Sequence, residues 1–185
     1  MTHGILALQG DYFAHGRALD KLGHKYIYVK TPQELAKVDS LIIPGGESTT
    51  MRKLAKSIGL WDKLKEFNKP IMGTCTGIIL LASEIDCPPE EGLRLLDVTI
   101  LRNAYGSQIN SFSTSGDYLP EKNIIEMVFI RAPKISRIGK QVEIIAQLDG
   151  EPVGVKQGSI IGLTFHPELS DDLTLHRMFC DLKHN

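Results

Sequence analysis

A cysteine between two glycines is the first feature of the sequence that could perform covalent chemistry. Cys75 lies in Gly73-Thr74-Cys75-Thr76-Gly77, between an apolar run at 70–72 and another at 78–82. The pattern predicts a buried strand, a tight turn and a buried helix, which is the layout of a nucleophile elbow. Unpaired N–H groups at the helix start favour a thiolate over a thiol. The alternative is a structural cysteine, because cysteine is among the most buried residue types.

A possible base and its orienting acid come near the other end of the chain. His166-Pro167-Glu168 follows an apolar segment at 160–165 that predicts a strand. In an extended chain, residues two apart point the same way, so the imidazole and the carboxylate are expected on one face. A surface histidine near an acid is the alternative interpretation.

A glycine-containing loop follows another predicted strand. Pro44-Gly45-Gly46-Glu47-Ser48-Thr49 comes after the apolar segment 41–43, and either Ser48 or Thr49 is expected to cap the next helix. A phosphate-cradling loop is the rival interpretation, but the sequence contains neither G-x-x-x-x-G-K-[ST] nor G-x-G-x-x-G. A cysteine, a base with its acid, and a loop able to offer a second N–H are the parts of acyl transfer through a thioester.

Strands that alternate with helices must position these residues. Strands are predicted at 5–8, 26–29, 41–43 and 160–165, and helices from 11, from 31, after 49 and after 170, the last capped by Ser170. The helix after 49 is expected to bury Met51, Leu54, Ala55 and Ile58 on one face. We therefore predict an α/β fold with a mostly parallel central sheet and helices on both faces, in which ligands gather at the carboxyl ends of strands.

The second half of the chain is less regular. Strands are predicted at 98–101 and 124–130, a long connection at 103–116, and a hairpin of 142–148 with 152–156 across Asp149-Gly150. Because helices are missing between these strands, we expect an antiparallel extension of the sheet. The length of 185 residues fits one domain, 1–185.

Composition excludes several classes of protein. The net charge is −1, with 21 basic and 22 acidic residues interspersed, so neither nucleic acid nor an anionic membrane is expected as a partner. The three cysteines form no C-x-x-C pair, which suggests neither disulfides nor a zinc site. No apolar run approaches the length of a membrane span and no signal peptide is recognised, so a cytoplasmic protein is expected.

Several segments, in the same order, resemble a known family. The three loops above resemble the signatures of class I (triad-type) glutamine amidotransferases. More narrowly, the chain from residue 5 to about 180 resembles the glutaminase subunits of pyridoxal 5′-phosphate synthase. The segments that carry this narrower resemblance are Leu8-Gln9-Gly10, Leu101-Arg102-Asn103-Ala104-Tyr105-Gly106, Ser111-Phe112, Phe129-Ile130-Arg131-Ala132-Pro133 and Phe165-His166-Pro167-Glu168-Leu169.

The resemblance implies hydrolysis of L-glutamine to L-glutamate and ammonia. Cys75 would attack the side-chain amide, His166 would hold and return the proton, and Glu168 would orient the imidazole. The backbone N–H groups of Gly46 and Thr76 would bind the oxyanion. Substrate binding carries over to Gly45, Gly46, Glu47, Arg102, Ile130 and Arg131.

Two positions depart from the family pattern. Thr76 stands where the relatives more often carry alanine, so packing beside the nucleophile is in question, and Ser107 stands where they usually carry arginine.

The resemblance also implies a separate partner, the synthase barrel subunit, as a dodecameric core with up to twelve glutaminases. The chain itself would hold no cofactor. The alternatives are a glutaminase for histidine or purine synthesis, and a redox sensor or scaffold that needs Cys75 alone.

Overall fold

A computed structural model describes residues 1–86, 88–102 and 111–182. Its elements, in chain order, are β1 (His3–Leu6), α1 (Tyr12–Lys21), β2 (Tyr26–Val29), α2 (Pro32–Leu35), β3 (Ser40–Ile43), α3 (Ser48–Ser57), α4 (Leu60–Lys65), β4 (Ile71–Thr74), α5 (Thr76–Leu81), β5 (Ala82–Asp86), β6 (Leu96–Leu101), β7 (Ser111–Tyr118), β8 (Asn123–Ile130), β9 (Lys134–Ile138), β10 (Glu143–Leu148), β11 (Glu151–Gln157), β12 (Ile160–Leu163), a 3-10 turn (Pro167–Leu169) and α6 (Thr174–Cys180).

The strands form a large mixed sheet and a small one. Within the described residues, nine strands follow the order β2-β1-β3-β4-β12-β11-β10-β7-β8. The pairs from β2 to β12 are parallel, and the pairs from β12 to β8 are antiparallel. The predicted α/β class and its antiparallel extension are therefore confirmed. Strands β5, β6 and β9 form a second sheet.

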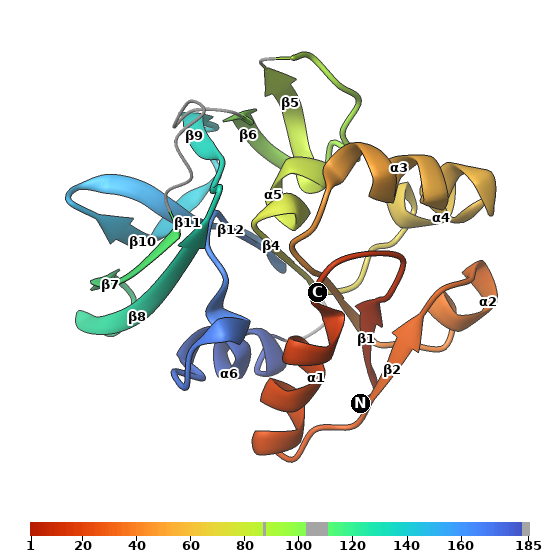
Figure 1. The fold of residues 1–185 in the computed structure, drawn as a ribbon, viewed down its shortest axis with the longest axis horizontal. Coiled ribbons are helices and arrows are strands. Elements are labelled where there is room, and N and C mark those ends of the chain that lie inside the picture. The colour runs from red at the N-terminus through yellow and green to blue at the C-terminus, as the bar shows by residue number, and fades with distance from the viewer. Residues whose placement is uncertain (87, 103–110, 183–185) are drawn as a thin grey trace.

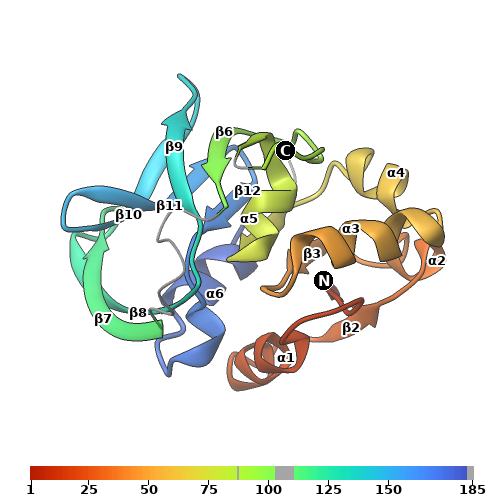
Figure 2. The same ribbon diagram turned by 45° about the horizontal axis from the view of Figure 1, so that its top comes forward.

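Helices cover both faces of the large sheet (Figures 1 and 2). Helices α1 and α6 lie on one side, and α3, α4 and α5 lie on the other. The alternation of a strand explains how one sheet serves two cores: Ile42 packs in the core under α1 and α6, whereas its neighbours Leu41 and Ile43 pack in the core under α3 to α5. All three side chains are fully buried.

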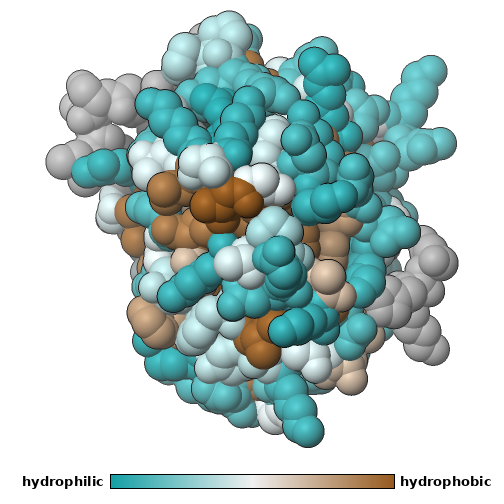
Figure 3. Space-filling view, turned by 90° about the vertical axis from the view of Figure 1, so that its right-hand side faces the viewer, coloured by the Kyte–Doolittle hydropathy of each residue, from teal (hydrophilic) through white to brown (hydrophobic). Residues whose placement is uncertain are grey.

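One edge of the large sheet is β2, whose residues are mostly half-buried. The side of the molecule seen in Figure 3 carries mainly hydrophilic side chains, with a strip of apolar ones across its middle. Among the described residues, no helix is long and apolar enough to cross a membrane.

Some local predictions about these elements were wrong. Residues 111–116 belong to β7 rather than to a connection, while the rest of that predicted connection, including Ser107, lies outside the described residues. Two of the four residues expected on the buried face of α3, Leu54 and Ile58, are exposed. Ser170 does not cap α6, which begins at Thr174 after the N-cap Leu173. The carboxylate of Asp172 accepts the N–H of Thr174 instead.

Candidate active site

The predicted elbow is present. Cys75 separates β4 from α5 and has φ 49° and ψ −102°, in the left-handed region that L-residues rarely adopt. Its N–H donates to Leu163 O at 2.8 Å, which holds the strained turn against β12. A side chain at Gly77 would overlap the carbonyl of Ile43, and one at Gly73 would crowd the backbone of Gly77. The two flanking glycines are therefore required by close packing of α5 on the sheet.

Parallel pairing brings the second loop to the same edge. Strands β4 and β12 are neighbours, with Thr74 opposite Leu163, so the loops after both strands meet. His166 N–H donates to Val128 O at 2.8 Å, which also ties the loop to β8. The predicted histidine–carboxylate pair is formed: His166 Nδ1 lies 2.7 Å from Glu168 Oε1.

The extended backbone predicted for His166-Pro167-Glu168 was wrong. Glu168 lies in the 3-10 turn Pro167–Leu169, not in an extended strand. The turn carries the carboxylate under the imidazole, where Glu168 is 6% exposed and His166 is 7% exposed. Burial on this scale makes the pair rigid and strongly coupled.

Burial and charge oppose one another at both groups. Burial lowers the pKa of His166, but hydrogen bonds and charge interactions with Cys75 and Glu168 outweigh it and raise the pKa to about 10. Burial raises the pKa of Glu168, yet the nearby His15 and His166 bring the pKa below its usual value. His166 is therefore protonated at neutral pH, which places a positive charge beside the Cys75 sulfur.

Two further histidines, which the sequence analysis missed, extend the contacts of His166 and Glu168 into the core. His15 Nε2 lies 3.5 Å from Glu168 Oε2 and 3.2 Å from Thr74 Oγ1, and His15 Nδ1 lies 3.0 Å from His176 Nε2. Both histidines are completely buried. Burial lowers the pKa of His15 and lowers that of His176 to about 3, so both rings are neutral. A possible signal was available: each histidine shares a helix face with apolar residues at i+3 and i+4.

Unpaired atoms decide how these rings are protonated. Within the described residues, Nδ1 of His176 is buried without a hydrogen-bond partner. A bare lone pair there costs less than a buried unpaired N–H, because the donor would lose its hydrogen bond to water outright. His176 therefore donates from Nε2 to His15, and His15 turns its own Nε2–H toward Thr74 and Glu168. The Glu168 carboxylate thus accepts a hydrogen bond from His166 through Oε1, while Oε2 lies 3.5 Å from His15 Nε2 and has no hydrogen-bond partner within the described residues.

In the glycine loop, hydrogen bonds hold both the carbonyl and the N–H of the peptide bond between Gly46 and Glu47. The Thr76 hydroxyl donates to Gly46 O at 2.6 Å, and the Glu47 N–H donates to Gln9 Oε1 at 2.6 Å. Thr76, one of the two departures from the family pattern, therefore fixes the loop beside Cys75. A side chain at Gly45 would overlap the His166 ring. This position accepts only glycine because the loop lies directly against the imidazole.

The helix after the glycine loop begins differently from the prediction. Neither Ser48 nor Thr49 caps α3; the N-cap is Glu47, whose carboxylate accepts the N–H groups of Thr49 at 2.9 Å and Thr50 at 2.6 Å. Hydrogen bonds from Thr50 and Thr49 lower the pKa of Glu47 to about 2, despite partial burial. Glu47 is therefore a fixed negative charge at the rim of the site.

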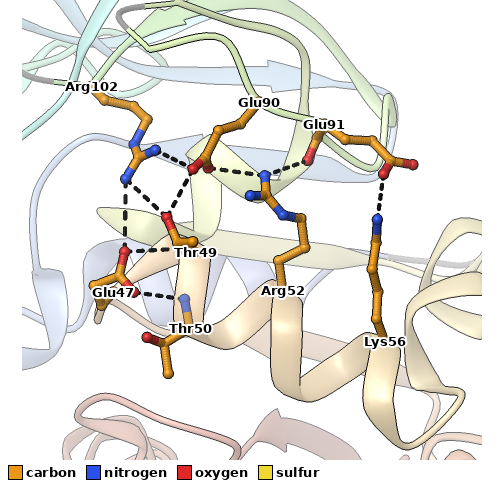
Figure 4. A network of polar contacts seen from close by, with 8 residues as sticks. All are labelled: Glu47, Thr49, Thr50, Arg52, Lys56, Glu90, Glu91 and Arg102. Atoms are coloured by element: carbon orange, nitrogen blue, oxygen red, sulfur yellow. Dashed lines mark hydrogen bonds and ion pairs between the residues drawn. The ribbon is translucent and has the colours of Figure 1, made fainter.

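Arg102 lies in a network of ion pairs (Figure 4). Its guanidinium approaches Glu90 Oε1 at 2.6 Å and Glu47 Oε1 at 3.7 Å, and Arg52 holds the other oxygen of Glu90 at 2.9 Å. The Arg102 side chain is 16% exposed. Burial raises the pKa of Glu90, but Thr49 and the two arginines more than offset it and lower the pKa. The network fixes the direction of Arg102 at the cavity wall.

One cavity of about 520 Å³ brings nearly all predicted site residues together. Arg131 lies in its wall with φ 47°, and Ile130 O is 3.8 Å from Cys75 Sγ. Glu168 lies behind His166 rather than in the wall. The predicted residues that line the cavity are Gly45, Gly46, Glu47, Cys75, Thr76, Arg102, Ile130, Arg131 and His166; residues that the prediction omitted include Gly10, Ser48, Ser111 and Leu169.

A strand–elbow–helix cysteine with a buried His–Glu pair, on a mixed α/β sheet, defines the triad class of amidotransferases. The chain belongs to the SNO glutamine amidotransferase family, whose sequence profile matches residues 5–183.

Individual relatives cover nearly the whole chain. The pyridoxal 5′-phosphate synthase subunit PdxT of Thermotoga petrophila is 49% identical over 98% of this chain and 99% of its own length. The PdxT subunit of Fervidobacterium nodosum is 43% identical over 97% and 95% of the two chains. A crystal structure described as a glutamine amidotransferase is 42% identical, covers 97% of each chain and superimposes with a TM-score of 0.91.

Proposed function

We propose that this chain is the glutaminase subunit of a pyridoxal 5′-phosphate synthase: it hydrolyses L-glutamine to L-glutamate and ammonia through Cys75, His166 and Glu168. The observation that carries the assignment is the buried chain of contacts behind the elbow, in which His166 binds Glu168 at 2.7 Å. Full-length relatives named as PdxT, at up to 49% identity, favour this pathway over a glutaminase for histidine or purine synthesis. We treat residues 1–185 as one glutaminase domain.

The reaction begins when the Cys75 thiolate attacks the side-chain amide carbon of glutamine. A tetrahedral oxyanion forms, and the backbone N–H groups of Gly46 and Thr76 bind it. The His166 imidazolium gives its proton to the leaving nitrogen, which departs as ammonia and leaves a thioester on Cys75. Glu168 stabilises the imidazolium and keeps Nδ1–H directed away from the substrate.

Water completes the cycle. Neutral His166 takes a proton from a water molecule, whose oxygen attacks the thioester carbon through a second oxyanion. The carbon–sulfur bond then breaks, glutamate leaves, and Cys75 and His166 return to the ion pair. His15 acts as a positioning residue in both half-reactions, because it faces the Glu168 oxygen that His166 does not use.

Charged groups at the cavity rim match the amino-acid end of glutamine. Arg102 and Arg131 supply positive charge for the α-carboxylate, and the ionised Glu47 supplies negative charge for the ammonium group. Ile130 and Gly45 shape the cavity between them. The ion pair with Glu90 already orients the Arg102 guanidinium, so Arg102 loses less side-chain entropy when glutamine binds.

Ammonia set free in solution would be lost to synthesis, so we place this chain on a synthase barrel subunit, up to twelve on a dodecameric core. A reducing compartment, the cytoplasm, suits a catalytic thiolate. The rival function is a redox sensor, which requires Cys75 but not His166. His166→Ala separates the two: a hydrolase loses activity, whereas a sensor keeps its thiol response.

The test is covalent labelling with 6-diazo-5-oxo-L-norleucine, a glutamine analogue that alkylates amidotransferase cysteines. We expect one adduct per chain on the peptide that contains Cys75, protection by excess glutamine, and no adduct in Cys75→Ser. Cys180, which is also buried, is an internal control for non-specific alkylation. Labelling that glutamine does not prevent, or that appears equally on Cys180, would contradict the proposed site.

A further inference from the structure

Three potential metal ligands meet at the end of the sheet opposite the cavity. His3 begins β1, His24 lies between α1 and β2, and Cys180 ends α6. One donor atom from each lies within 4.8 Å of the other two. Because β1 and β3 are parallel to β4 and β12, the starts of these strands face away from the loops that hold Cys75 and His166. The cluster is therefore separate from the proposed glutaminase site.

Two of the three donor atoms are spaced nearly as they would be around a tetrahedral ion. His3 Nε2 lies 3.1 Å from His24 Nδ1. Zinc binds nitrogen at about 2.0–2.1 Å and sulfur at about 2.3 Å, so ligand atoms in a tetrahedral site lie roughly 3.3–3.8 Å apart. The two nitrogens are already close to this spacing. The Cys180 sulfur lies within 4.8 Å of both nitrogens, so binding an ion requires it to come closer to them by up to about 1 Å.

One histidine also has the outer-shell contact typical of a metal ligand. His3 Nδ1 lies 2.7 Å from Ser40 Oγ, on the first residue of β3. A metal-bound histidine usually uses its second ring nitrogen in such a hydrogen bond, which fixes the ring orientation. Here Ser40 turns Nε2 of His3 toward His24. Phe179 packs against the same ring, with centroids 5.7 Å apart, and limits its rotation.

The burial of the three side chains leaves one route by which an ion can reach the cluster. His3 is completely buried and Cys180 is 8% exposed, whereas His24 is half-buried at the surface. An ion can therefore enter past His24, and water can fill the fourth position. A donor set of two imidazoles and one thiolate suits zinc and similar borderline-soft cations, and it does not suit Mg²⁺ or Ca²⁺, which prefer oxygen ligands.

We propose that His3, His24 and Cys180 form a binding site for a divalent cation of the zinc class. On binding, the Cys180 thiol releases its proton to solvent and the sulfur joins the two imidazole nitrogens around the ion. The site cross-links α6 to β1 and to the segment between α1 and β2. These ligands are far apart in sequence and match no short zinc motif, which is why the spacing of the cysteines did not indicate them.

Co²⁺ is the probe, added to the metal-free full-length chain in which Cys87 is replaced by serine. Binding at the site gives a thiolate-to-cobalt charge-transfer band and the intense visible bands of tetrahedral Co²⁺, with one ion per chain. The bands are expected to vanish in Cys180→Ser. In His24→Gln, the apparent affinity for Co²⁺ is expected to fall at least tenfold. The matched control is Cys75→Ser, which removes the other described thiol and keeps the bands.

Thermal unfolding gives an independent readout. Zn²⁺ at about 100 times its dissociation constant is expected to raise Tm by roughly 5–10 °C, because ligands that bind only the folded chain stabilise it by mass action. His24→Gln is a half-buried substitution, so its circular dichroism should match the parent while the metal-dependent shift is lost. Absence of the charge-transfer band, its survival in Cys180→Ser, or binding without any rise in Tm would each overturn the proposal.

Discussion

Replacing Glu168 with glutamine removes one charge from the centre of the site and changes little in volume. In the native chain the two carboxylate oxygens face two different donors: Oε1 accepts from His166 at 2.7 Å, and Oε2 faces His15 at 3.5 Å. Glutamine offers only one oxygen, and its amide group is itself a donor. An amide nitrogen placed against Nδ1–H of His166 sets two donors against each other, so His166 loses its acceptor; an amide oxygen on that side leaves the amide nitrogen facing His15 Nε2.

The burial of Glu168 determines how far the substitution should lower kcat. The Glu168 side chain has no exposed surface, so solvent does not screen the loss. Breaking a buried charged pair by removing one partner costs about 3–5 kcal/mol. If this cost falls on the transition states that carry the imidazolium, Glu168→Gln lowers kcat by roughly 10²- to 10⁴-fold. The pKa of His166, which Glu168 helps to raise, should fall as well, and the alkaline limb of the pH–rate profile moves to lower pH.

The assay measures glutamate release by the chain in complex with a synthase barrel subunit. The rate is followed from pH 6 to pH 10, which is the side of the profile that leads up to the pKa of His166, about 10. The matched control is Glu143→Gln, because the Glu143 side chain is 73% exposed and lies 4.0 Å from Lys156. That variant should keep the native rate. A Glu168→Gln enzyme within about threefold of the native kcat, or one with an unshifted profile, would refute the role given to the carboxylate.

Three further results are expected. Thr76→Val removes the hydroxyl that holds Gly46 O at 2.6 Å; the loss of one hydrogen bond, about 1 kcal/mol, should lower kcat/KM roughly fivefold, and Thr76→Ser should restore it, whereas equal rates for valine and serine would exclude the hydroxyl. Gly45→Ala places a methyl group on the His166 ring, so activity should fall at least 10²-fold without loss of the fold, and full activity would contradict the close approach. The pKa of His176 is about 3 when folded and about 6.5 when unfolded, so the unfolded state binds more protons in acid; stability is complete above pH 6.5 and is lost as pH falls toward 3, by about 2 kcal/mol at pH 5. Urea unfolding of the native chain and of His176→Gln at pH 7.5 and 5 isolates this loss, because His3, His15 and His166 titrate in both proteins; an equal change with pH in the two proteins would show that His176 is not buried neutral.

The sequence predicted the strand, tight turn and helix around Cys75 well because strong local signals coincide there. A glycine on either side of Cys75 permits one backbone path, and apolar runs on both sides specify a strand and a helix. The hairpin across Asp149-Gly150 was equally clear, since β10 and β11 meet at that turn. At these positions local propensity and tertiary packing agree.

Other features depend on contacts between distant segments. Strands β5 and β9 were not predicted, because β5 continues directly from α5 and both strands find their partners in β6. The cap of α3 went to Glu47, which can reach two N–H groups at once, rather than to the serine or threonine that propensity favours.

The buried histidines show the same limit. His15 and His176 are 161 residues apart, and only the packing of α1 beside α6 brings them together behind Glu168. Sequence periodicity could mark each as a polar residue on an apolar helix face, but not their contact with one another. The neutral state of both rings follows from the completed core.

The central claim is that Cys75 hydrolyses glutamine on behalf of a synthase. The most direct measurement is glutamate release by this chain alone and with a pyridoxal 5′-phosphate synthase barrel subunit, with Cys75→Ala as the blank. We predict hydrolysis that rises strongly with the partner and disappears in the variant. A folded chain that releases no glutamate in either condition, when paired with the synthase of its own organism, would contradict the account.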